Sequence, residues 1–118
     1  MAESLFPRER IRKKKDFLVL YKKGYRYKGK YFNLISLPNA LPYSRAGVVA
    51  SRKVGNAVAR NRAKRRMREL FRRNKALLQY PVDILLVASA DLVRAEWSDV
   101  QQQYFQALAK IFEKKRGR

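Results

Sequence analysis

The sequence predicts one α+β domain, in which helices cover a single mixed β-sheet. Three segments have the apolar spacing of helices, and four shorter runs have the composition of strands. Their order along the chain is helix, three strands, helix, strand, helix. Because the chain has 118 residues, of which 47% are hydrophobic, it has room for one modest core and no second. We therefore expect a single domain over residues 1–118, with flexible basic ends at residues 1–10 and 114–118.

The first helix is expected over Lys14–Lys23 and ends at Gly24, a residue type favoured after the last turn of a helix. Its five consecutive apolar residues, from Phe17 to Tyr21, cannot all face one side. The second apolar side of this helix must therefore be covered by another part of the protein or be used to bind a partner. Three runs with the period of strands follow, namely Tyr25–Lys28, Tyr31–Leu37 and Arg45–Ser51.

A second helix begins after Gly55 and Asn56, which punctuate its start. Its apolar side chains share an arc of about 120°, a width typical of a core-facing stripe. The members of this stripe are Ala59, Ala63, Met67, Leu70, Phe71 and Leu78. The apolar run Val82–Ala88 is short enough for a buried strand.

The last helix is predicted to start at Ser98, because Ser98 and Gln101 have the spacing of a capping box. Apolar residues then recur at the spacing of one helical face. They are Val100, Tyr104, Ala107, Leu108, Ile111 and Phe112.

The chain carries 29 basic and 9 acidic residues, and its formal net charge is +20. Such a charge opposes folding by self-repulsion, which indicates a polyanionic partner: nucleic acid first, and an anionic membrane surface second. The absence of cysteine and histidine removes disulfides, thiolate metal sites, the usual general base and the commonest zinc ligand. The sequence has no secretory signal and no apolar run near the length of about 20 residues that a membrane span needs. We therefore expect a soluble, cytoplasmic protein.

The segment from Arg60 to Lys75 contains nine basic residues and one acid, Glu69. In a helix its like charges meet four residues apart, as Arg60 and Lys64 do, and each such pair costs about 0.2–0.5 kcal/mol. A solvated helix face usually mixes charges of both signs. The pattern therefore favours a bound polyanion over a merely solvated surface.

The approach to this helix adds further donors for phosphate. Arg52, Lys53 and the Gly55-Asn56 turn lie near the helix N-terminus, where free N–H groups attract anions. Arginine can hold a phosphate through two hydrogen bonds. Two DNA-binding motifs fit poorly, because a basic zipper needs heptads and a helix-turn-helix domain is largely helical, whereas this chain turns to a strand at Val82.

The stretch SRKVGNAVARNRAKRRMRELFR closely resembles the signature of the protein subunit of bacterial ribonuclease P, whose core is an Arg-Asn-Arg helix, here Arg60-Asn61-Arg62. In addition, KKKDFLVLYKKG resembles the family's first helix, KYFNLISL its long strand, and RAGVVASRK the strand that enters the motif. The resemblance covers residues 8–112. It implies three helices on a four-stranded mixed sheet in the order α-β-β-β-α-β-α. It also implies an unusual left-handed β-α-β crossover through the Arg-Asn-Arg helix, against the general preference for right-handed connections.

The resemblance implies a function as well. The family's enzyme is an endonuclease that removes the 5′ leader of precursor transfer RNA; a large RNA subunit, which requires Mg²⁺, performs the hydrolysis, and the protein assists substrate binding. We therefore expect no catalytic residue, no metal site and no stably bound cofactor in the protein. Its expected partners are the catalytic RNA and precursor tRNA, without a membrane or an obligate protein partner. The inventory agrees, since the chain has no carboxylate pair suited to acid–base work.

Two binding surfaces follow from the resemblance. The catalytic RNA is expected to lie against the Arg-Asn-Arg helix, and the single-stranded leader in a groove between the first helix and the sheet. The residues expected to contact the catalytic RNA are Asn56, Arg60, Asn61, Arg62, Lys64, Arg65 and Arg68. Those expected to contact the leader are Phe17, Tyr21, Asn33, Ile35, Arg52 and Lys53.

Aromatic rings in a cationic groove can hold a single strand whatever its bases, which suits an enzyme that meets many different leaders. In this arrangement Leu18 and Leu20 are available to the core, while Phe17 and Tyr21 line the groove. The alternative, in which both rings are ordinary core residues, stays open. Ile35 stands where some relatives carry an aromatic residue, so we expect weaker stacking on the strand side.

Two other functions stay open at this point. The protein could be a ribosomal or other RNA-chaperone protein, which uses the same charge without any role in leader cleavage. It could also be a metal-dependent nuclease in its own right, acting through scattered carboxylates. A cleavage assay with the protein alone, the catalytic RNA alone, and both together separates the three functions.

Overall fold

The computed structural model describes residues 7–116, and the side chains of residues 7–112. The predicted order of helices and strands is confirmed, with short 3₁₀ turns between them. The elements are η1 (Pro7–Glu9), α1 (Lys14–Lys23), β1 (Tyr25–Lys28), β2 (Phe32–Pro38), β3 (Arg45–Val49), α2 (Ala57–Arg73), η2 (Lys75–Leu77), β4 (Val82–Ala88), η3 (Ala90–Leu92) and α3 (Trp97–Arg116).

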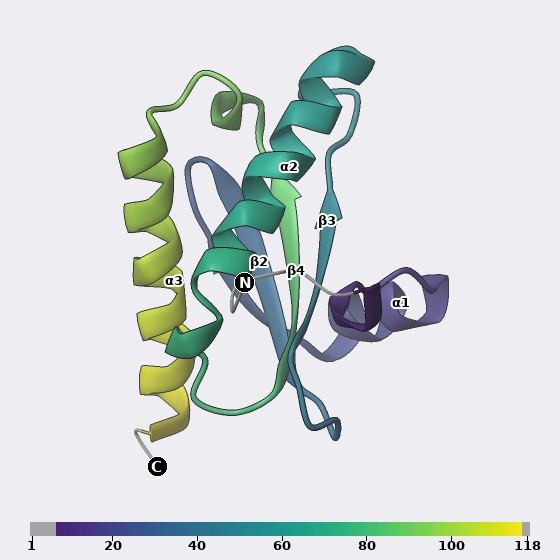
Figure 1. The fold of residues 1–118 in the computed structure, drawn as a ribbon, viewed down its shortest axis with the longest axis vertical. Coiled ribbons are helices and arrows are strands. Elements are labelled where there is room, and N and C mark those ends of the chain that lie inside the picture. The colour runs from purple at the N-terminus through teal and green to yellow at the C-terminus, as the bar shows by residue number, and fades with distance from the viewer. Residues whose placement is uncertain (1–6, 117–118) are drawn as a thin grey trace.

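The four strands form one mixed sheet in the order β1-β2-β4-β3. β2 is antiparallel to both β1 and β4, whereas β3 is parallel to β4. Since β3 and β4 are neighbours and the chain between them contains α2, the basic helix forms a β-α-β crossover, as expected (Figure 1). The left-handed sense of this crossover stays a prediction.

Helices α2 and α3 cover one face of the sheet, and the main core lies between them and the strands (Figure 1). The stripe predicted for α3 is confirmed, because all six of its residues are buried. On α2 the stripe is confirmed for Ala63, Met67, Leu70 and Phe71. Ala59 is only half-buried, and Leu78 lies beyond the end of the helix at Arg73.

Helix α1 packs on the other face of the sheet, over a smaller core of Ile11, Leu20, Ile35 and Leu85. Gly24 follows α1 as predicted, but not in a left-handed conformation, since its φ is −74°. A Cβ atom at Gly24 would lie 2.4 Å from Cγ2 of Ile35. The glycine is therefore needed for the close approach of the helix end to β2 rather than for an unusual backbone angle.

The capping box predicted at Ser98 is wrong. Helix α3 begins at Trp97, so Ser98 already lies within its first turn. The carbonyl oxygen of Glu96 accepts the first hydrogen bonds, from the N–H groups of Asp99 and Val100 at 3.1 Å each. The helix then continues to Arg116, and residues 117–118 lie outside the described residues.

The segment before α1 contacts the rest of the fold at two residues, Glu9 and Ile11. Glu9 is 6% exposed, and both of its carboxylate oxygens accept hydrogen bonds from Nζ of Lys75, at 3.1 and 3.2 Å. The N–H of Ile11 donates to the carbonyl oxygen of Ala46 at 2.9 Å, which ties the segment to the edge strand β3. These contacts hold Glu9 and Ile11 against the fold, whereas the flexibility expected for residues 1–10 stays a prediction; residues 1–6 lie outside the described part of the chain.

Candidate nucleic-acid interface

Helix α2 starts at a glycine–asparagine pair for a clear geometric reason. Gly55 has φ of +143°, a conformation that residues with a side chain rarely adopt. Asn56 is the N-cap residue, and its Oδ1 accepts a hydrogen bond from the N–H of Ala59 at 3.0 Å. Asn56 therefore has a structural role at the position where the sequence predicts an RNA contact; the contact itself stays a prediction.

The arginines of α2 divide into two sets, of which the first binds the protein itself. Arg66 donates to the carbonyl oxygens of Leu92, at 2.6 Å, and Ala95, at 2.9 Å. Its guanidinium also lies 5.5 Å from the centre of the Trp97 ring. Because one fork holds two loop carbonyls, Arg66 fastens the connection between β4 and α3 to α2.

Arg72 and Arg73 complete this first set by sharing the one acid of the helix. Glu69 accepts from Nη2 of Arg72 at 2.6 Å and from Nε of Arg73 at 3.1 Å. The hydrogen bond from Arg72 is the main cause that lowers the pKa of Glu69 below its usual value. These two arginines are thereby neutralised in part.

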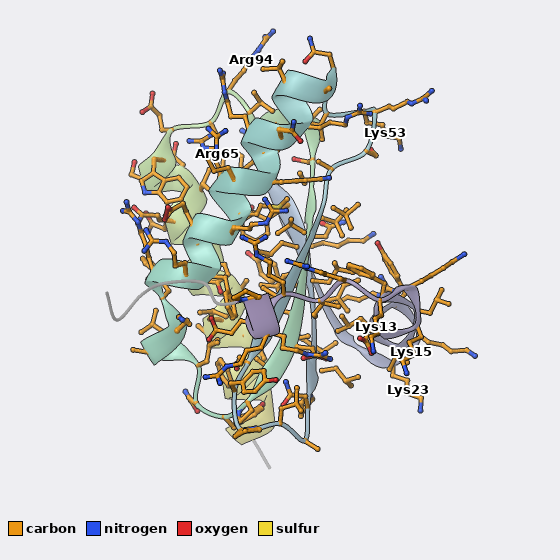
Figure 2. The ribbon with its side chains drawn as sticks, turned by 45° about the vertical axis from the view of Figure 1, so that its right-hand side comes forward. Lys13, Lys15, Lys23, Lys53, Arg65 and Arg94 are labelled. Atoms are coloured by element: carbon orange, nitrogen blue, oxygen red, sulfur yellow. The ribbon has the colours of Figure 1, made fainter. Side chains whose placement is uncertain are left out.

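The second set has side chains without a hydrogen bond or ion pair to any described residue. Asn61, Arg62 and Arg65 are exposed, and Arg60, Lys64 and Arg68 are half-buried. Figure 2 shows Arg65 extending from α2 away from the sheet. Seven residues are predicted to contact the catalytic RNA. Six of them lie on α2 and have side chains unpaired with any described residue; the seventh is the N-cap residue Asn56.

The face of the sheet opposite the main core carries the residues predicted for the leader. The register aligns Lys28, Asn33, Val87 and Val49 across the four strands in one row, and Arg26, Ile35, Leu85 and Gly47 in the next. Helix α1 lies over the second row, and Asn33 in the first row is exposed. Lys28, Val49 and Val87 were missed by the sequence analysis, because only the strand register places them beside Asn33.

Phe17 packs from α1 onto this face. A Cβ atom at Gly47 would lie 2.8 Å from Cε1 of Phe17, so the glycine admits the ring against the backbone of β3. Leu20 is 1% exposed, as expected, but Leu18 is 56% exposed. At about 100° per residue Leu18 and Leu20 point in nearly opposite directions, whereas Leu20 and Phe17 are only about 60° apart. Phe17 therefore takes the inward place predicted for Leu18, and it is half-buried.

Tyr21 and Ile35 differ sharply in access. Tyr21 is 39% exposed, and the guanidinium of Arg26 lies 5.8 Å from its ring centre. Ile35 is only 2% exposed because the end of α1 at Gly24 covers it. The contact between Ile35 and the leader stays a prediction, and Tyr21 is the more accessible of the two side chains.

Arg52 and Lys53 lie in the turn that follows β3 and are both exposed. The turn is held by hydrogen bonds from the N–H groups of Val54 and Gly55 to the carbonyl oxygens of Ser51 and Arg52. Since β3 ends at Val49, in the row of Asn33, these two cations flank the open end of the sheet face. Figure 2 shows Lys53 at this end, and Lys13, Lys15 and Lys23 grouped around α1.

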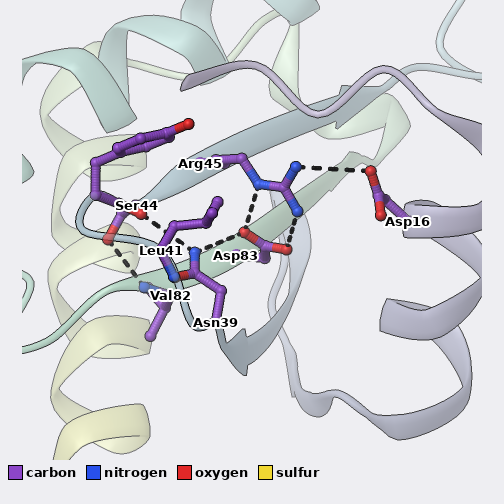
Figure 3. Close-up of polar contacts among 8 residues, drawn as sticks. Asp16, Asn39, Leu41, Ser44, Arg45, Val82 and Asp83 are labelled. Carbon is purple, nitrogen blue, oxygen red and sulfur yellow. Dashed lines mark hydrogen bonds and ion pairs between the residues drawn. The ribbon is translucent and has the colours of Figure 1, made fainter. Parts of the chain in front are cut away.

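A polar cluster on this same face ties α1 to the sheet (Figure 3). Asp83 accepts from Nε of Arg45 at 2.9 Å, from Nη2 of Arg45 at 2.6 Å and from Nδ2 of Asn39 at 2.8 Å. Nη1 of Arg45 lies 3.6 Å from a carboxylate oxygen of Asp16 on α1. The hydrogen bond to Asp83 is the main cause that raises the pKa of Arg45. Sequence analysis missed this cluster, since its members are far apart in the chain.

Within residues 7–112, no group of three or more carboxylate, histidine or cysteine residues is arranged to hold a metal ion. None of the helices in the described part of the chain is long and apolar enough to cross a membrane.

Comparisons with known proteins agree with this arrangement. The family Ribonuclease P matches residues 5–112. The Ribonuclease P protein component of Thermotoga maritima is 37% identical over 115 residues, which cover 94% of this chain and 98% of that relative. The Ribonuclease P protein component of Syntrophus aciditrophicus is 39% identical over 92 residues, or 78% of this chain and 77% of that relative.

Solved structures have the same fold. The RNase P protein from Thermotoga maritima has a TM-score of 0.77 at 35% identity, covering 86% of this chain and 96% of its own. The Staphylococcus aureus RNase P protein has a TM-score of 0.75 at 32% identity, covering 87% of this chain and 94% of its own. A family match over nearly the whole sequence, carried on the same arrangement of helices and strands, shows that the chain belongs to the ribonuclease P protein family.

Proposed function

We propose that this protein is the subunit that binds RNA in a ribonuclease P ribonucleoprotein and promotes removal of the 5′ leader from precursor tRNA. In this proposal the RNA subunit performs the endonucleolytic step and holds the Mg²⁺ that it requires. The protein contributes binding and orientation, has no catalytic residue and holds no cofactor. The complex acts in the cytoplasm, and its protein needs no further protein partner.

The observation that carries the proposal is the division of the cations on α2. Arg66, Arg72 and Arg73 are used within the fold, whereas Arg60, Arg62, Lys64, Arg65 and Arg68 have no partner among the described residues. Gathering unpaired like charges on the side of one helix that faces away from the core is unfavourable for the free protein. A phosphate backbone would neutralise them, so we assign this face to the catalytic RNA.

The opposite side of the sheet supports the second part of the proposal. Tyr21 offers an accessible ring, Asn33 an amide, and Arg26, Lys28, Arg52 and Lys53 positive charge around them. A stacking ring beside cations is the chemistry that holds single strands without base preference. Because α1 and α2 lie on opposite faces of the sheet, leader and catalytic RNA can bind at the same time.

A cleavage assay at low Mg²⁺ tests the proposed reaction. Precursor tRNA is incubated with the protein alone, with the catalytic RNA alone, and with both. We expect correct 5′ cleavage only when both are present. Cleavage by the protein alone would identify a nuclease in its own right. RNA binding without any stimulation of cleavage would indicate an RNA-chaperone protein instead.

The α2 face is tested by Arg65→Ala, with Lys110→Ala as the matched control. Both residues are exposed and both variants lose one positive charge, but Lys110 lies on α3. We expect Arg65→Ala to lower the slope of log K against log salt for the catalytic RNA by about 0.7–0.9, and the control to leave the slope unchanged. Equal slopes in the two variants would show that the α2 face is only solvated.

The leader groove is tested by Tyr21→Leu, with Phe105→Leu as the control. Tyr21 is 39% exposed and Phe105, on α3, is 42% exposed, so both changes remove an accessible ring. We expect Tyr21→Leu to weaken binding of leader-bearing precursor about tenfold relative to mature tRNA, because stacking on a ring is worth about 1–3 kcal/mol. A proportional loss for precursor and mature tRNA would place the leader elsewhere.

A further inference from the structure

Three arginines from two distant segments surround one recess beside the edge strand β3. The recess has a volume of about 180 Å³ and is lined by Arg10, Ile11, Arg12, Ala46, Val48 and Arg68, among others. It has room for a phosphate group, which has five non-hydrogen atoms.

The pairing of the N-terminal segment with β3 explains why these arginines converge. Arg10 forms a parallel bridge with Ala46, whose side chain belongs to the main core on the α2 side of the sheet. Side chains alternate along an extended chain, so Arg10 and Arg12 lie on the α2 side while Ile11 points to the α1 side. Ile11 is accordingly 4% exposed in the smaller core.

Arg68 meets this pair from α2. The side chains of Arg10, Arg12 and Arg68 have no hydrogen bond or ion pair with any residue in the described part of the chain. The acids nearest in sequence are already engaged: Glu9 by Lys75, Glu69 by Arg72, and Asp16 by Arg45. Asp16 lines, together with Arg10 and Arg12, a neighbouring recess of about 370 Å³.

The electrostatics of Arg68 agree with a cation site that has no counterion. Burial is the main cause that lowers the pKa of Arg68, and the charges of Arg10 and Arg12 lower it further. Arginine nevertheless stays protonated at neutral pH. Three guanidinium groups that line one recess with no acid in its lining repel one another until an anion enters, although Arg10 and Arg12 are exposed and only Arg68 is half-buried.

We infer that Arg10, Arg12 and Arg68 form a site for one phosphate group of an RNA backbone. This inference rests on the proposed function for the source of the phosphate, and it adds a built subsite that joins the N-terminal segment to α2. The recess lies at the β3 edge, between the α2 face and the face covered by α1. A phosphodiester of either the catalytic RNA or the precursor can reach it.

The site is tested first on the full free protein with inorganic phosphate, so that RNA binding is not needed. The probe is the NMR signal of each arginine Nε–H, assigned by Arg→Lys variants. We expect the signals of Arg10, Arg12 and Arg68 to shift with one shared, saturable affinity. Arg12→Ala should weaken the affinity seen at Arg68 about tenfold or more, since a charge-assisted hydrogen bond is lost. Lys110→Ala should leave it within about twofold.

Two RNA measurements then identify the source of the phosphate. Weaker binding of the catalytic RNA by Arg12→Ala, with an unchanged ratio of precursor to mature tRNA affinity, assigns the phosphate to the catalytic RNA. A changed ratio assigns it to the precursor. Arg12→Lys keeps the charge but loses the two-pronged fork, and we expect it to recover only part of the affinity.

The inference is overturned if phosphate gives no saturable shift at Arg68, or if Arg12→Ala binds phosphate and both RNAs as the wild type does. In that case Arg65→Ala still tests the α2 face independently. If the wild type binds RNA but phosphate does not bind at the three arginines, the proposed function stands and only the phosphate site is refuted. If the wild type binds no RNA at all, both the phosphate site and the proposed function are refuted.

Discussion

Replacing Asp83 with alanine should be the most destabilising single change in the polar cluster that joins α1 to the sheet. The residue is 8% exposed and accepts two hydrogen bonds from Arg45 and a third from Asn39. Each bond from the guanidinium is worth about 1.5–3 kcal/mol, which brings the pair to about 3–6 kcal/mol. In the variant, the side chain of Arg45 is still 21% exposed to solvent and still lies 3.6 Å from Asp16. Interactions with water and with Asp16 therefore replace part of the lost free energy. We expect a loss of about 3 kcal/mol, the low end for breaking a buried pair.

The assay is urea unfolding at pH 7, followed by circular dichroism, of the wild type, Asp83→Ala, Arg45→Met and the double variant. Methionine keeps the length and apolar stem of Arg45 without its charge. We expect a coupling energy of about 2 kcal/mol between the two positions, with similar m-values for all four proteins. A coupling energy below about 0.5 kcal/mol would show that the pair is effectively solvated and that the reasoning from its geometry is mistaken.

Three further outcomes are expected. Tyr104→Phe should raise the free energy of unfolding by about 1 kcal/mol, because its buried hydroxyl has no hydrogen-bond partner among the described residues; an unchanged or lower melting temperature would contradict this. Glu69→Gln should cost less than about 1 kcal/mol at pH 7. The hydrogen bond from Arg72 lowers the folded-state pKa of Glu69 from its ordinary 4.5. The stability difference between Glu69→Gln and the wild type should therefore be constant above about pH 4.5 and vanish as the pH falls through the folded-state pKa. Urea titrations at each pH measure this difference. Gly47→Ala should displace the Phe17 ring, which lies 2.8 Å from the position of the added Cβ, and cost about 1–3 kcal/mol; calorimetry that shows no loss would mean that the ring shifts freely.

Much of this structure is encoded locally and could be predicted from the sequence. The bounds of α1 and β4 match the predicted segments, and the buried stripe of α3 is complete, because helical and strand periods depend only on near neighbours. The exposure of Arg62 and Arg65 follows in the same way from the position of Met67 and Phe71 on the opposite side of their helix.

The tertiary structure decided which of the similar side chains remain available for a ligand. The helical period places Arg66 beside the apolar stripe and Arg65 opposite it, but only the folded chain brings the carbonyls of Leu92 and Ala95 to Arg66. Ile35 has the pattern of an accessible strand residue until the end of α1 at Gly24 covers it.

The same holds for the recess at the edge of the sheet. Arg10 and Arg12 belong to the basic segment before α1, and its composition does not show to which side of the sheet their side chains point. Pairing with β3 sets the alternation of their side chains and brings them to Arg68, more than fifty residues away in the sequence. Sequence period determines which face of an element is apolar, whereas contacts between distant segments determine which charges are neutralised, and only the folded chain makes those contacts.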